Sequence, residues 1–297
     1  MVLKYTIKET DTYQNVKEVL KAYFGISERL LLKLKNTQNI LLNGTSTYVS
    51  KEVVSGDIIE VLIDFVEDNS NIVPIKMNLN IIYEDDSYLV LNKEPNMAIH
   101  PSMLHYDTSL SNGVKYYFDS INLKKKIRPV NRLDKDTSGL VIFAKNEYIQ
   151  ECLVSQMKTK NMKKTYIAVC EGLFTEKSGT INAPIARKPG SIIERYVDSS
   201  GDIAITHYEV LDEIDNVSIV KCVLETGRTH QIRVHLSHLG HPILGDTLYG
   251  NKNTNVPRQL LHAYKLDFIH PISKENVSYT APIPEDFKNY INTEIIQ

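Results

Sequence analysis

The most informative stretch of the chain is Arg132-Leu133-Asp134-Lys135-Asp136-Thr137-Ser138-Gly139, followed at once by Leu140-Val141-Ile142-Phe143-Ala144. The apolar run predicts a buried β-strand, because it is short and follows residues typical of turns. A carboxylate on a loop that such a strand anchors is held in place while its oxygens stay accessible, as a nucleophile requires. The cations Arg132 and Lys135 favour the ionised form of Asp134. These residues alone support equally a nucleophilic Asp134 and an Asp134 that only forms a turn or pairs with its neighbours.

The composition indicates a folded protein without a general affinity for polyanions. The 297 residues suffice for one large domain or two, and 42% of them are hydrophobic, which is enough for a core. The formal net charge is −2 and the isoelectric point is near 6.5. These values argue against a generally basic nucleic-acid-binding protein.

The charge is nevertheless distributed unevenly along the chain. From Leu123 to Lys164 there are eleven Lys and Arg against four Asp and Glu, a local excess of +7. Such a run is often no more than a solvated face. Because this one surrounds the Asp134 loop, it also predicts a surface for a polyphosphate partner.

The cysteines and the apolar runs indicate an intracellular protein. Cys152, Cys170 and Cys222 are odd in number, scattered and without C-x-x-C spacing, which favours reduced thiols over disulfides or a zinc site. No signal peptide opens the sequence, and no apolar run reaches membrane-spanning length. We therefore expect a soluble cytoplasmic protein that does not enter a membrane.

Residues 1–68 are predicted to form a small domain of their own. The pattern predicts a helix from Val16 to Phe24, then a helix from Glu28 to Lys35 with Ser27 as its N-cap. The inward-facing residues of the second helix are expected to be Leu30, Leu31 and Leu34. Strands follow at Ile40–Leu42, before an Asn-Gly turn, and at Asp57–Ile63.

This order of two helices and short strands, ending in Val54-Ser55-Gly56-Asp57-Ile58-Ile59, resembles the RNA-binding domain first seen in ribosomal protein S-four. The helical half is rich in Lys and Arg. The resemblance implies that cations there, among them Arg29 and Lys33, contact RNA.

Residues 69–78 are polar and contain Pro74, so we predict a linker there, followed by a second domain at 79–297. Strands are predicted at 79–83, 88–92, 140–144, 166–170, 204–211 and 217–224, and helices at 110–118, 147–160 and 229–239. Strands and helices do not alternate regularly. The pattern therefore favours an α+β domain with a largely antiparallel sheet over a doubly wound one.

Four segments after the Asp134 loop carry further candidate residues. The first, Lys164 to Ala168, places Tyr166 near the start of a strand. The second, Gly227 to His235, is predicted to open a helix with Thr229 at its N-cap and Arg233 beside the apolar stripe. That stripe and the helix end are Ile232, Leu236, Leu239 and Gly240. The third and fourth segments are Ile243-Leu244-Gly245-Asp246-Thr247-Leu248-Tyr249-Gly250 and Arg258-Gln259-Leu260-Leu261-His262-Ala263-Tyr264.

In this order and spacing, the five segments resemble the RluA/RluD class of RNA pseudouridine synthases. The family pattern is approximately H-R-L-D-x-x-T-S-G, K-x-Y, G-R-x-H-Q-I-R-x-H, L-G-D-x-x-Y-G and L-H-A-x-x-L-x-F-x-H-P. The match runs from about Leu79 to Pro284. The resemblance implies the pseudouridine synthase fold and the isomerisation of specific uridines in structured RNA, with the longer, two-domain layout.

The resemblance also implies roles for individual residues. Asp134 matches the catalytic aspartate, which attacks the nucleotide either at the sugar C1′ or on the uracil ring. Tyr166 matches the active-site Tyr, placed against the uracil and a candidate general base. Arg233 matches the cation that pairs with the catalytic carboxylate. Arg132 matches the residue that helps to hold the RNA with its target nucleotide extruded.

Further residues are expected to bind the RNA: Asn131, Lys163, Lys164, Arg228, His230, Gln231 and Leu261. At one of these positions the chain departs from the family, because Asn131 stands where His usually precedes Arg-Leu-Asp. Both side chains form hydrogen bonds, so Asn131 is expected to replace an orienting contact.

No cofactor is expected, since the isomerisation conserves oxidation state and the sequence has neither a P-loop nor G-x-G-x-x-G. The expected partner is RNA, ribosomal rather than transfer, bound by a monomer. A metal site at His230, His235, His238 and His241 is disfavoured, because no Cys or Glu completes their spacing.

Two other functions compete with the isomerase. Asp136-Thr137-Ser138-Gly139 has the form of an aspartic protease signature, but that mechanism needs two such aspartates and the chain has one copy. A non-enzymatic RNA-binding protein of ribosome assembly would share the N-terminal domain and the basic run. The presence of Asp134, Tyr166 and Arg233 together favours the enzyme.

Overall fold

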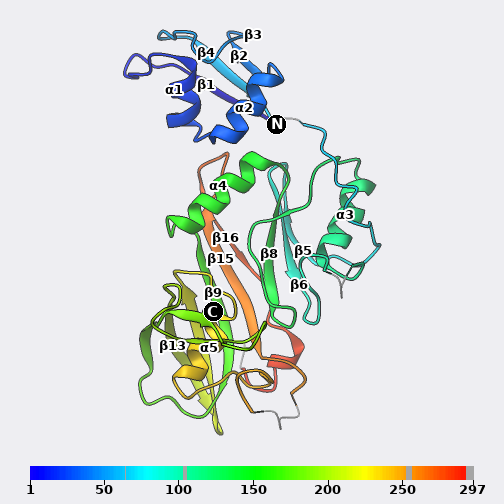
Figure 1. Cartoon of the computed structure of the whole chain (residues 1–297), viewed down its shortest axis with the longest axis vertical. Coiled ribbons are helices and arrows are strands. Elements are labelled where there is room, and N and C mark those ends of the chain that lie inside the picture. The colour runs from blue at the N-terminus through cyan, green and yellow to red at the C-terminus, as the bar shows by residue number, and fades with distance from the viewer. Residues whose placement is uncertain (64, 103–105, 252–255, 292–297) are drawn as a thin grey trace.

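The computed structural model describes residues 1–63, 65–102, 106–251 and 256–291. Within these ranges the chain forms a small N-terminal unit with a four-stranded sheet and a larger unit built on a ten-stranded sheet (Figure 1). A separate two-stranded hairpin lies beside the larger sheet. In Figure 1 the N-terminal unit lies at one end of the long axis, next to the helix α4.

The N-terminal unit contains a sheet with the strand order β1-β4-β2-β3. Its strands are β1 (Val2–Thr6), β2 (Ile40–Leu42), β3 (Thr45–Ser46) and β4 (Ile58–Leu62). The turn between β2 and β3 has positive φ at Asn43 (52°) and Gly44 (78°), as a two-residue hairpin requires. Both strands predicted there are confirmed. The sequence patterns did not predict β1, whose buried positions are only Leu3 and Tyr5.

The helices of this unit are α1 (Val16–Glu18), a π-helical continuation η1 (Val19–Tyr23), and α2 (Glu28–Asn36). The predicted cap is confirmed, because the Ser27 hydroxyl oxygen accepts a hydrogen bond from the Leu30 N–H at 3.2 Å. The three predicted inward-facing leucines of α2 are all buried. Local sequence therefore determines α2 almost completely.

The larger sheet has the strand order β10-β13-β14-β9-β15-β8-β6-β5, with β16 paired to β15 and β7 to β8. Its predicted strands are β5 (Ile81–Glu84), β6 (Tyr88–Lys93), β8 (Ser138–Ala144), β9 (Lys163–Glu171), β13 (Ile205–Ile214) and β14 (Val217–Leu224). The strands that were not predicted are β7 (Arg128–Pro129), β10 (Ser178–Asn182), β15 (Leu261–Ile269), β16 (Asn276–Thr280) and the hairpin β11 (Ile185–Arg187) and β12 (Arg195–Val197). The pairings between these strands are antiparallel except that of β15 with β8. The predicted α+β class with a largely antiparallel sheet is confirmed.

The strand β8 lies at the centre of the sheet and is buried at every position. Gly139 has φ +111°, and a Cβ there would lie 2.3 Å from the Ala263 carbonyl oxygen. Only glycine permits this approach, so Gly139 allows β8 to run parallel to β15 directly after the Asp134 loop. The predicted anchoring strand is confirmed.

The helices of the larger unit are α3 (Leu110–Ser120), α4 (Glu147–Lys158), α5 (Gln231–His238) and the short η2 (Glu285–Phe287). Two details predicted for α5 are wrong. Its N-cap is His230, in the left-handed region at φ 58°, and not Thr229. Leu239 does not continue the buried stripe, since it lies past the last helical turn and is 38% exposed.

The two units share buried apolar contacts and a short irregular connection. Core side chains of α2 and β4 belong to the same apolar cluster as Tyr148, Ile149 and Leu153 of α4. Residues 69–78 contain no helix or strand. Before them, Glu67 receives two hydrogen bonds of 2.6 Å from the Arg128 guanidinium. The domain limits at 68 and 79 and the likeness to the S-four domain stay predictions.

Candidate active site

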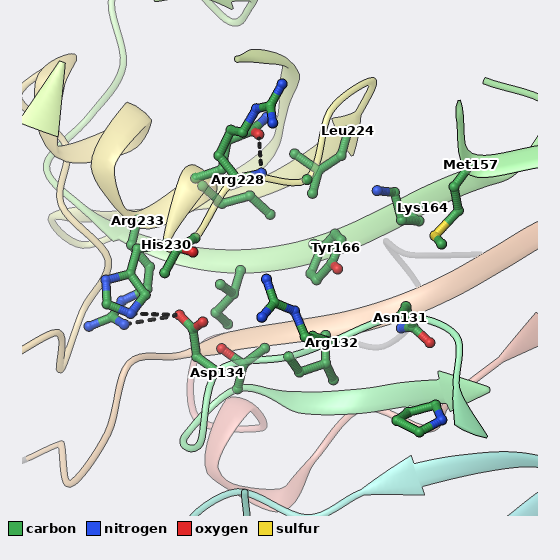
Figure 2. Close-up of a pocket in the computed structure, with 18 of the residues that line it drawn as sticks. Asn131, Arg132, Asp134, Met157, Lys164, Tyr166, Leu224, Arg228, His230 and Arg233 are labelled. Carbon is green, nitrogen blue, oxygen red and sulfur yellow. Dashed lines mark hydrogen bonds and ion pairs between the residues drawn. The ribbon is translucent and has the colours of Figure 1, made fainter. Parts of the chain in front are cut away.

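A cavity of about 440 Å³ opens between the Asp134 loop, β9, and the turn that precedes α5 (Figure 2). The predicted site residues that line it are Asn131, Arg132, Asp134, Lys164, Tyr166, Arg228, His230, Gln231, Arg233 and Leu261. The three candidate catalytic residues, far apart in sequence, therefore face one space. The volume lies within the range of small-molecule sites.

The Asp134 loop is fixed by two buried basic side chains that bind its backbone. The Thr137 N–H closes a turn on the Asp134 carbonyl at 3.1 Å. Lys93 Nζ donates to the Lys135 carbonyl at 2.8 Å, and the Arg258 guanidinium donates to the Asp136 carbonyl at 2.9 Å. Because both side chains are more than 90% buried, they hold the loop from inside the protein, and burial lowers the pKa of Lys93 to about 7. The Asp134 side chain itself stays 26% exposed.

Arg233 holds the Asp134 carboxylate and is itself held by a buried carboxylate. Its Nη1 lies 3.0 Å from Asp134 Oδ2, while Nε and Nη2 donate to the two oxygens of Asp246 at 2.7 and 2.9 Å. Burial opposes the charge of the guanidinium, but the hydrogen bond and charge of Asp246, followed by the charge of Asp134, raise the pKa of Arg233 above its usual range. Arg233 is therefore a fixed cation at neutral pH.

The cation that pairs with Asp134 is not a neighbour in sequence. In the described part of the chain neither Arg132 nor Lys135 forms an ion pair with its carboxylate. The partner, Arg233, comes from α5, 99 residues further on.

Tyr166 lies on β9 with its ring toward the cavity and is 7% exposed. Burial, and next the charge of Asp134, raise the pKa of its phenol above the usual range. The hydroxyl is therefore protonated at neutral pH. It forms no hydrogen bond to any residue that the structure describes, so it is available to a ligand.

Two cations of the cavity wall have no partner among the residues that the structure describes. Lys164 is only 9% exposed, yet among the described residues its ammonium has neither a hydrogen bond nor an ion pair, and burial lowers its pKa. Arg132 is exposed and likewise unpaired within those residues. A buried cation without a partner is costly, so Lys164 indicates an anionic ligand. Arg228 differs, because it donates to the Ile203 carbonyl at 2.9 Å and lies 3.6 Å from Asp202.

Asn131 lines the cavity and binds the backbone of β8. Its Nδ2 donates to the Leu140 carbonyl and its Oδ1 accepts from the Ile142 N–H, both at 2.9 Å. These bonds tie the Asp134 loop to β8, as an orienting contact does. The second N–H of the amide has no partner among the described residues, and substrate binding by Asn131 stays a prediction.

Gln231 also stabilises the cavity wall. Its carbonyl accepts from the Thr226 hydroxyl and the Arg228 N–H, and its amide donates to the backbone of Ile205 and the hydroxyl of Thr206. These four bonds, between 2.8 and 3.0 Å, fix the turn before α5. Gln231 is thus a support of the wall and not a free contact. Leu261 of β15 forms an apolar part of the same wall.

Lys163, Arg29 and Lys33 lie outside this cavity. Lys163 is exposed at the start of β9, and Arg29 is 3.6 Å from Glu147 with its side chain 83% exposed. Lys33 lies over the ring of Phe65, 2.6 Å from Glu147 and 3.6 Å from Glu67. The charge of Lys33 is therefore engaged by the protein in the absence of RNA, and its contact with RNA stays a prediction.

Sequence reasoning missed His100, Asp246 and Tyr249. His100 lines the cavity opposite the turn before α5, and burial, with help from Arg132, lowers its pKa. Asp246 and Tyr249 lie behind Arg233 and His230. The motif that contains these two residues was recognised, but sequence spacing alone could not show that it lies behind the reactive carboxylate.

Two of the histidines considered and disfavoured as metal ligands make other contacts. His235 binds the Thr206 hydroxyl and the Ala183 carbonyl at 2.9 Å each, and His241 lies 3.1 Å from the Glu171 carbonyl. Where the structure describes the chain, no three His, Cys, Asp or Glu side chains gather as a metal ion requires. None of the helices described there is sufficiently long and apolar to cross a membrane.

Comparison with known proteins identifies the family. The family model for RNA pseudouridylate synthase matches residues 87–238. The uncharacterized RNA pseudouridine synthase YjbO of Bacillus subtilis is 40% identical over 271 residues, which are 91% of this chain and 96% of that protein. The chain belongs to the RNA pseudouridylate synthase family. As a family member it is an isomerase, so the non-enzymatic alternative and the protease are set aside.

Two further relatives extend this likeness. Ribosomal large subunit pseudouridine synthase D of Haemophilus influenzae is 36% identical over 295 residues, covering 94% of this synthase and 90% of the relative. The solved structure of human RNA pseudouridylate synthase domain containing 1 superimposes with a TM-score of 0.59 at 30% identity, covering 69% of this chain and 83% of the human one. The predicted pseudouridine synthase fold is confirmed.

Proposed function

We propose that this synthase converts a uridine of large-subunit ribosomal RNA to pseudouridine, acting in the cytoplasm as a monomer with Asp134 as the nucleophile. The choice of RNA is supported by the relatives named ribosomal large subunit pseudouridine synthase D, which are 34–36% identical to this chain. The observation that carries the proposal is the Asp134 carboxylate, held by Arg233 in a cavity whose wall contains the unpaired cation Lys164.

Asp134 acts as the nucleophile because it is fixed, ionised and accessible. The reaction breaks the C1′–N1 bond and forms a C1′–C5 bond. C5 loses its proton, and N1 gains one. An anionic carboxylate adds to an electron-poor carbon of the nucleotide, at C1′ or on the uracil ring. At C1′ it displaces N1 of the uracil and is later displaced by C5, whereas on the ring it leaves after the C1′–C5 bond has formed. Arg233 keeps the carboxylate oriented between these steps.

Tyr166 enters the reaction as a protonated phenol that faces the uracil. It becomes a base only after it loses its proton, and the negative charge of Asp134 opposes that loss. When the Asp134 carboxylate forms an ester with the nucleotide, this charge disappears and the phenol becomes easier to deprotonate. We therefore assign removal of the C5 proton to the step after the nucleophile has added.

The cations of the wall suit an extruded nucleotide. A base within an RNA helix cannot reach a cavity of this kind, so the target nucleotide must leave the stack. Lys164 and Arg132 then meet the phosphates on either side of it, which gives Lys164 the partner that the described residues do not supply. The N-terminal unit adds a second surface for structured RNA.

The test is an assay on ribosomal and transfer RNA with two matched carboxylate variants. Asp134→Ala is expected to abolish product, a loss of at least ~10³-fold, because nothing else in the cavity replaces the nucleophile. Asp136→Asn removes the neighbouring carboxylate of the same loop and is expected to leave the rate within about twofold.

Product is measured by chemical mapping of pseudouridine before and after incubation. New pseudouridine in large-subunit RNA that depends on Asp134 supports the proposal. If the wild type modifies only transfer RNA, the substrate assignment is wrong. If Asp134→Ala is as active as Asp136→Asn, the nucleophile is wrong.

A further inference from the structure

The Asp134 carboxylate has a second neighbour, on the same oxygen that binds Arg233. His230 Nε2 lies 3.8 Å from Asp134 Oδ2 (Figure 2). The imidazole stands at the N-cap of α5 with its backbone in the left-handed region, and its side chain is only 13% exposed. This unusual backbone conformation turns the ring toward the carboxylate and away from the helix.

The other edge of the imidazole is held by Tyr249. The Tyr249 hydroxyl lies 2.8 Å from His230 Nδ1, and its oxygen accepts a hydrogen bond from the Arg195 N–H of β12 at 2.9 Å. The phenol ring also lies 5.1 Å from the guanidinium carbon of Arg233. A single tyrosine therefore contacts both groups that face Asp134.

These contacts favour one tautomer of the neutral imidazole. The Tyr249 oxygen already accepts from the backbone, so its own proton is directed at the lone pair of His230 Nδ1. The ring proton then sits on Nε2 and points to Asp134. In the other tautomer the Nε2 lone pair would face a carboxylate, and the Tyr249 proton would have no acceptor among the described residues.

The charged groups around His230 agree with a neutral ring. Burial is the main cause that lowers its pKa, and the cations Arg233 and Arg195 lower it further. Asp134 and, more weakly, Asp246 act in the opposite direction. The balance is a lowered pKa, so the imidazole is uncharged at neutral pH and donates only through Nε2.

We propose that Tyr249 and His230 are positioning residues for the nucleophile. Hydrogen bonds run from the Arg195 N–H through the Tyr249 hydroxyl to the imidazole, whose Nε2 stands 3.8 Å from Asp134 Oδ2. This role rests on the proposed function, and it replaces the RNA contact expected for His230. The same short turn supports both neighbours of the carboxylate, because Asp246 orients Arg233 and Tyr249 orients His230. Asp134 therefore has one hydrogen-bonded donor, Arg233, and one nearby N–H dipole, that of His230.

The kinetic test uses Tyr249→Phe, which keeps the ring beside Arg233 and removes only the hydroxyl. The single-turnover rate at saturating RNA is expected to fall about tenfold, while KM changes less than about twofold, because the loss concerns the reactive carboxylate and not RNA binding. The control is Tyr117→Phe, on α3 and outside the cavity wall, which loses a 2.6 Å hydrogen bond to Glu84 of β5. Its rate is expected to equal that of the wild type.

A double-mutant cycle separates positioning from simple support of the turn. Asn tolerates the backbone conformation of residue 230 and is too short to reach Asp134, so His230→Asn removes the end of the chain. If the chain acts as a unit, adding Tyr249→Phe to His230→Asn causes no further loss of rate. Two losses that multiply would show that Tyr249 acts through the turn alone, which overturns the proposal.

Nuclear magnetic resonance of the His230 ring gives a readout that needs no RNA. The wild type is expected to carry its proton on Nε2 at neutral pH, and Tyr249→Phe to raise the pKa of the ring, because the hydroxyl stabilises only the neutral form. The acid limb of the single-turnover rate is then expected to move to higher pH in that variant.

The two readouts distinguish the possible failures. A proton on Nδ1, or a charged ring at neutral pH, overturns the hydrogen-bond chain whatever the activity. If the expected tautomer is seen but the wild type modifies no RNA, the proposed function fails, and the positioning role fails with it.

Discussion

The cations of the cavity wall and the cations of α2 were both predicted to bind RNA, yet the fold treats them differently. Lys164 is nearly buried beside Asp134 and has no partner in the described part of the protein. Lys33 of α2 contacts the carboxylates of Glu147 and Glu67 and the ring of Phe65. The comparison shows that a cation's use depends on whether the fold brings a carboxylate to it.

The unpaired Lys164 and the paired Lys33 have different roles. The burial of an unpaired ammonium in a cavity is not compensated until an anion binds, so its charge remains available for phosphate. Lys33 instead links α2 to the first turn of α4, where Ser27 also donates to Glu151 at 2.7 Å (Figure 1). We therefore expect cavity variants to change the reaction and interface variants to change stability.

The largest effect is expected from Arg233→Lys in the cavity. A lysine cannot form the three hydrogen bonds that Arg233 makes to Asp134 and Asp246, and the wholly buried Asp246 would lose its partner. The single-turnover rate is expected to fall by about 10²–10³-fold while RNA affinity stays within about threefold. Rapid-quench kinetics and filter binding measure the two quantities.

The matched control is Arg128→Lys at the junction of the two units. Arg128 is equally buried and also binds a carboxylate with two hydrogen bonds, but its partner is Glu67. We expect this variant to lower the melting temperature by several degrees and to leave the rate within about twofold. Equal losses of rate in both variants would mean that Arg233 matters only for stability.

The second effect concerns RNA binding by the cavity cations. Lys164→Met is expected to weaken RNA affinity about tenfold at moderate salt and to reduce the salt slope by about 1, because one phosphate contact is lost. Lys163→Met alters the exposed neighbour on the same strand and serves as the control. Affinities measured from 50 to 300 mM salt give both slopes. An unaltered slope for Lys164→Met would show that this lysine meets no phosphate.

Local sequence predicted those parts of the molecule that local interactions determine. The helix α2 with its Ser27 cap, the strand β8 and the gathering of Asp134, Tyr166 and Arg233 followed from turn residues, apolar runs and family motifs. Each of these features depends on short stretches of chain or on a complete motif.

The features that sequence did not predict depend on contacts between distant segments. The strand β15 pairs in parallel with β8, and its pattern of mixed residues gives no clear period. The partner of Asp134 is 99 residues away, so the local pattern pointed to Arg132 and Lys135 and only the family resemblance pointed to Arg233. Counting Lys and Arg could not distinguish Lys33 from Lys164, because only the folded chain brings Glu147 to one of them.

The smallest effect is expected from Lys33→Met at the α2 interface. The ion pair is about one-third exposed on the lysine side, so its removal should lower the free energy of unfolding by only about 0.5–1 kcal/mol. RNA affinity and its salt slope should not change, since the Lys33 ammonium is already paired with the Glu147 carboxylate. Chemical denaturation and filter binding measure the two quantities.

The control for Lys33→Met is Lys35→Met, two residues further along α2. The Lys35 side chain is exposed and forms no ion pair with the described residues. This variant is expected to change neither the free energy of unfolding nor the RNA affinity. The informative contrary outcome is a loss of RNA affinity and of salt slope in Lys33→Met as large as in Lys164→Met. The helix would then have to leave Glu147 when RNA binds, and the two groups of cations would differ only in the free protein.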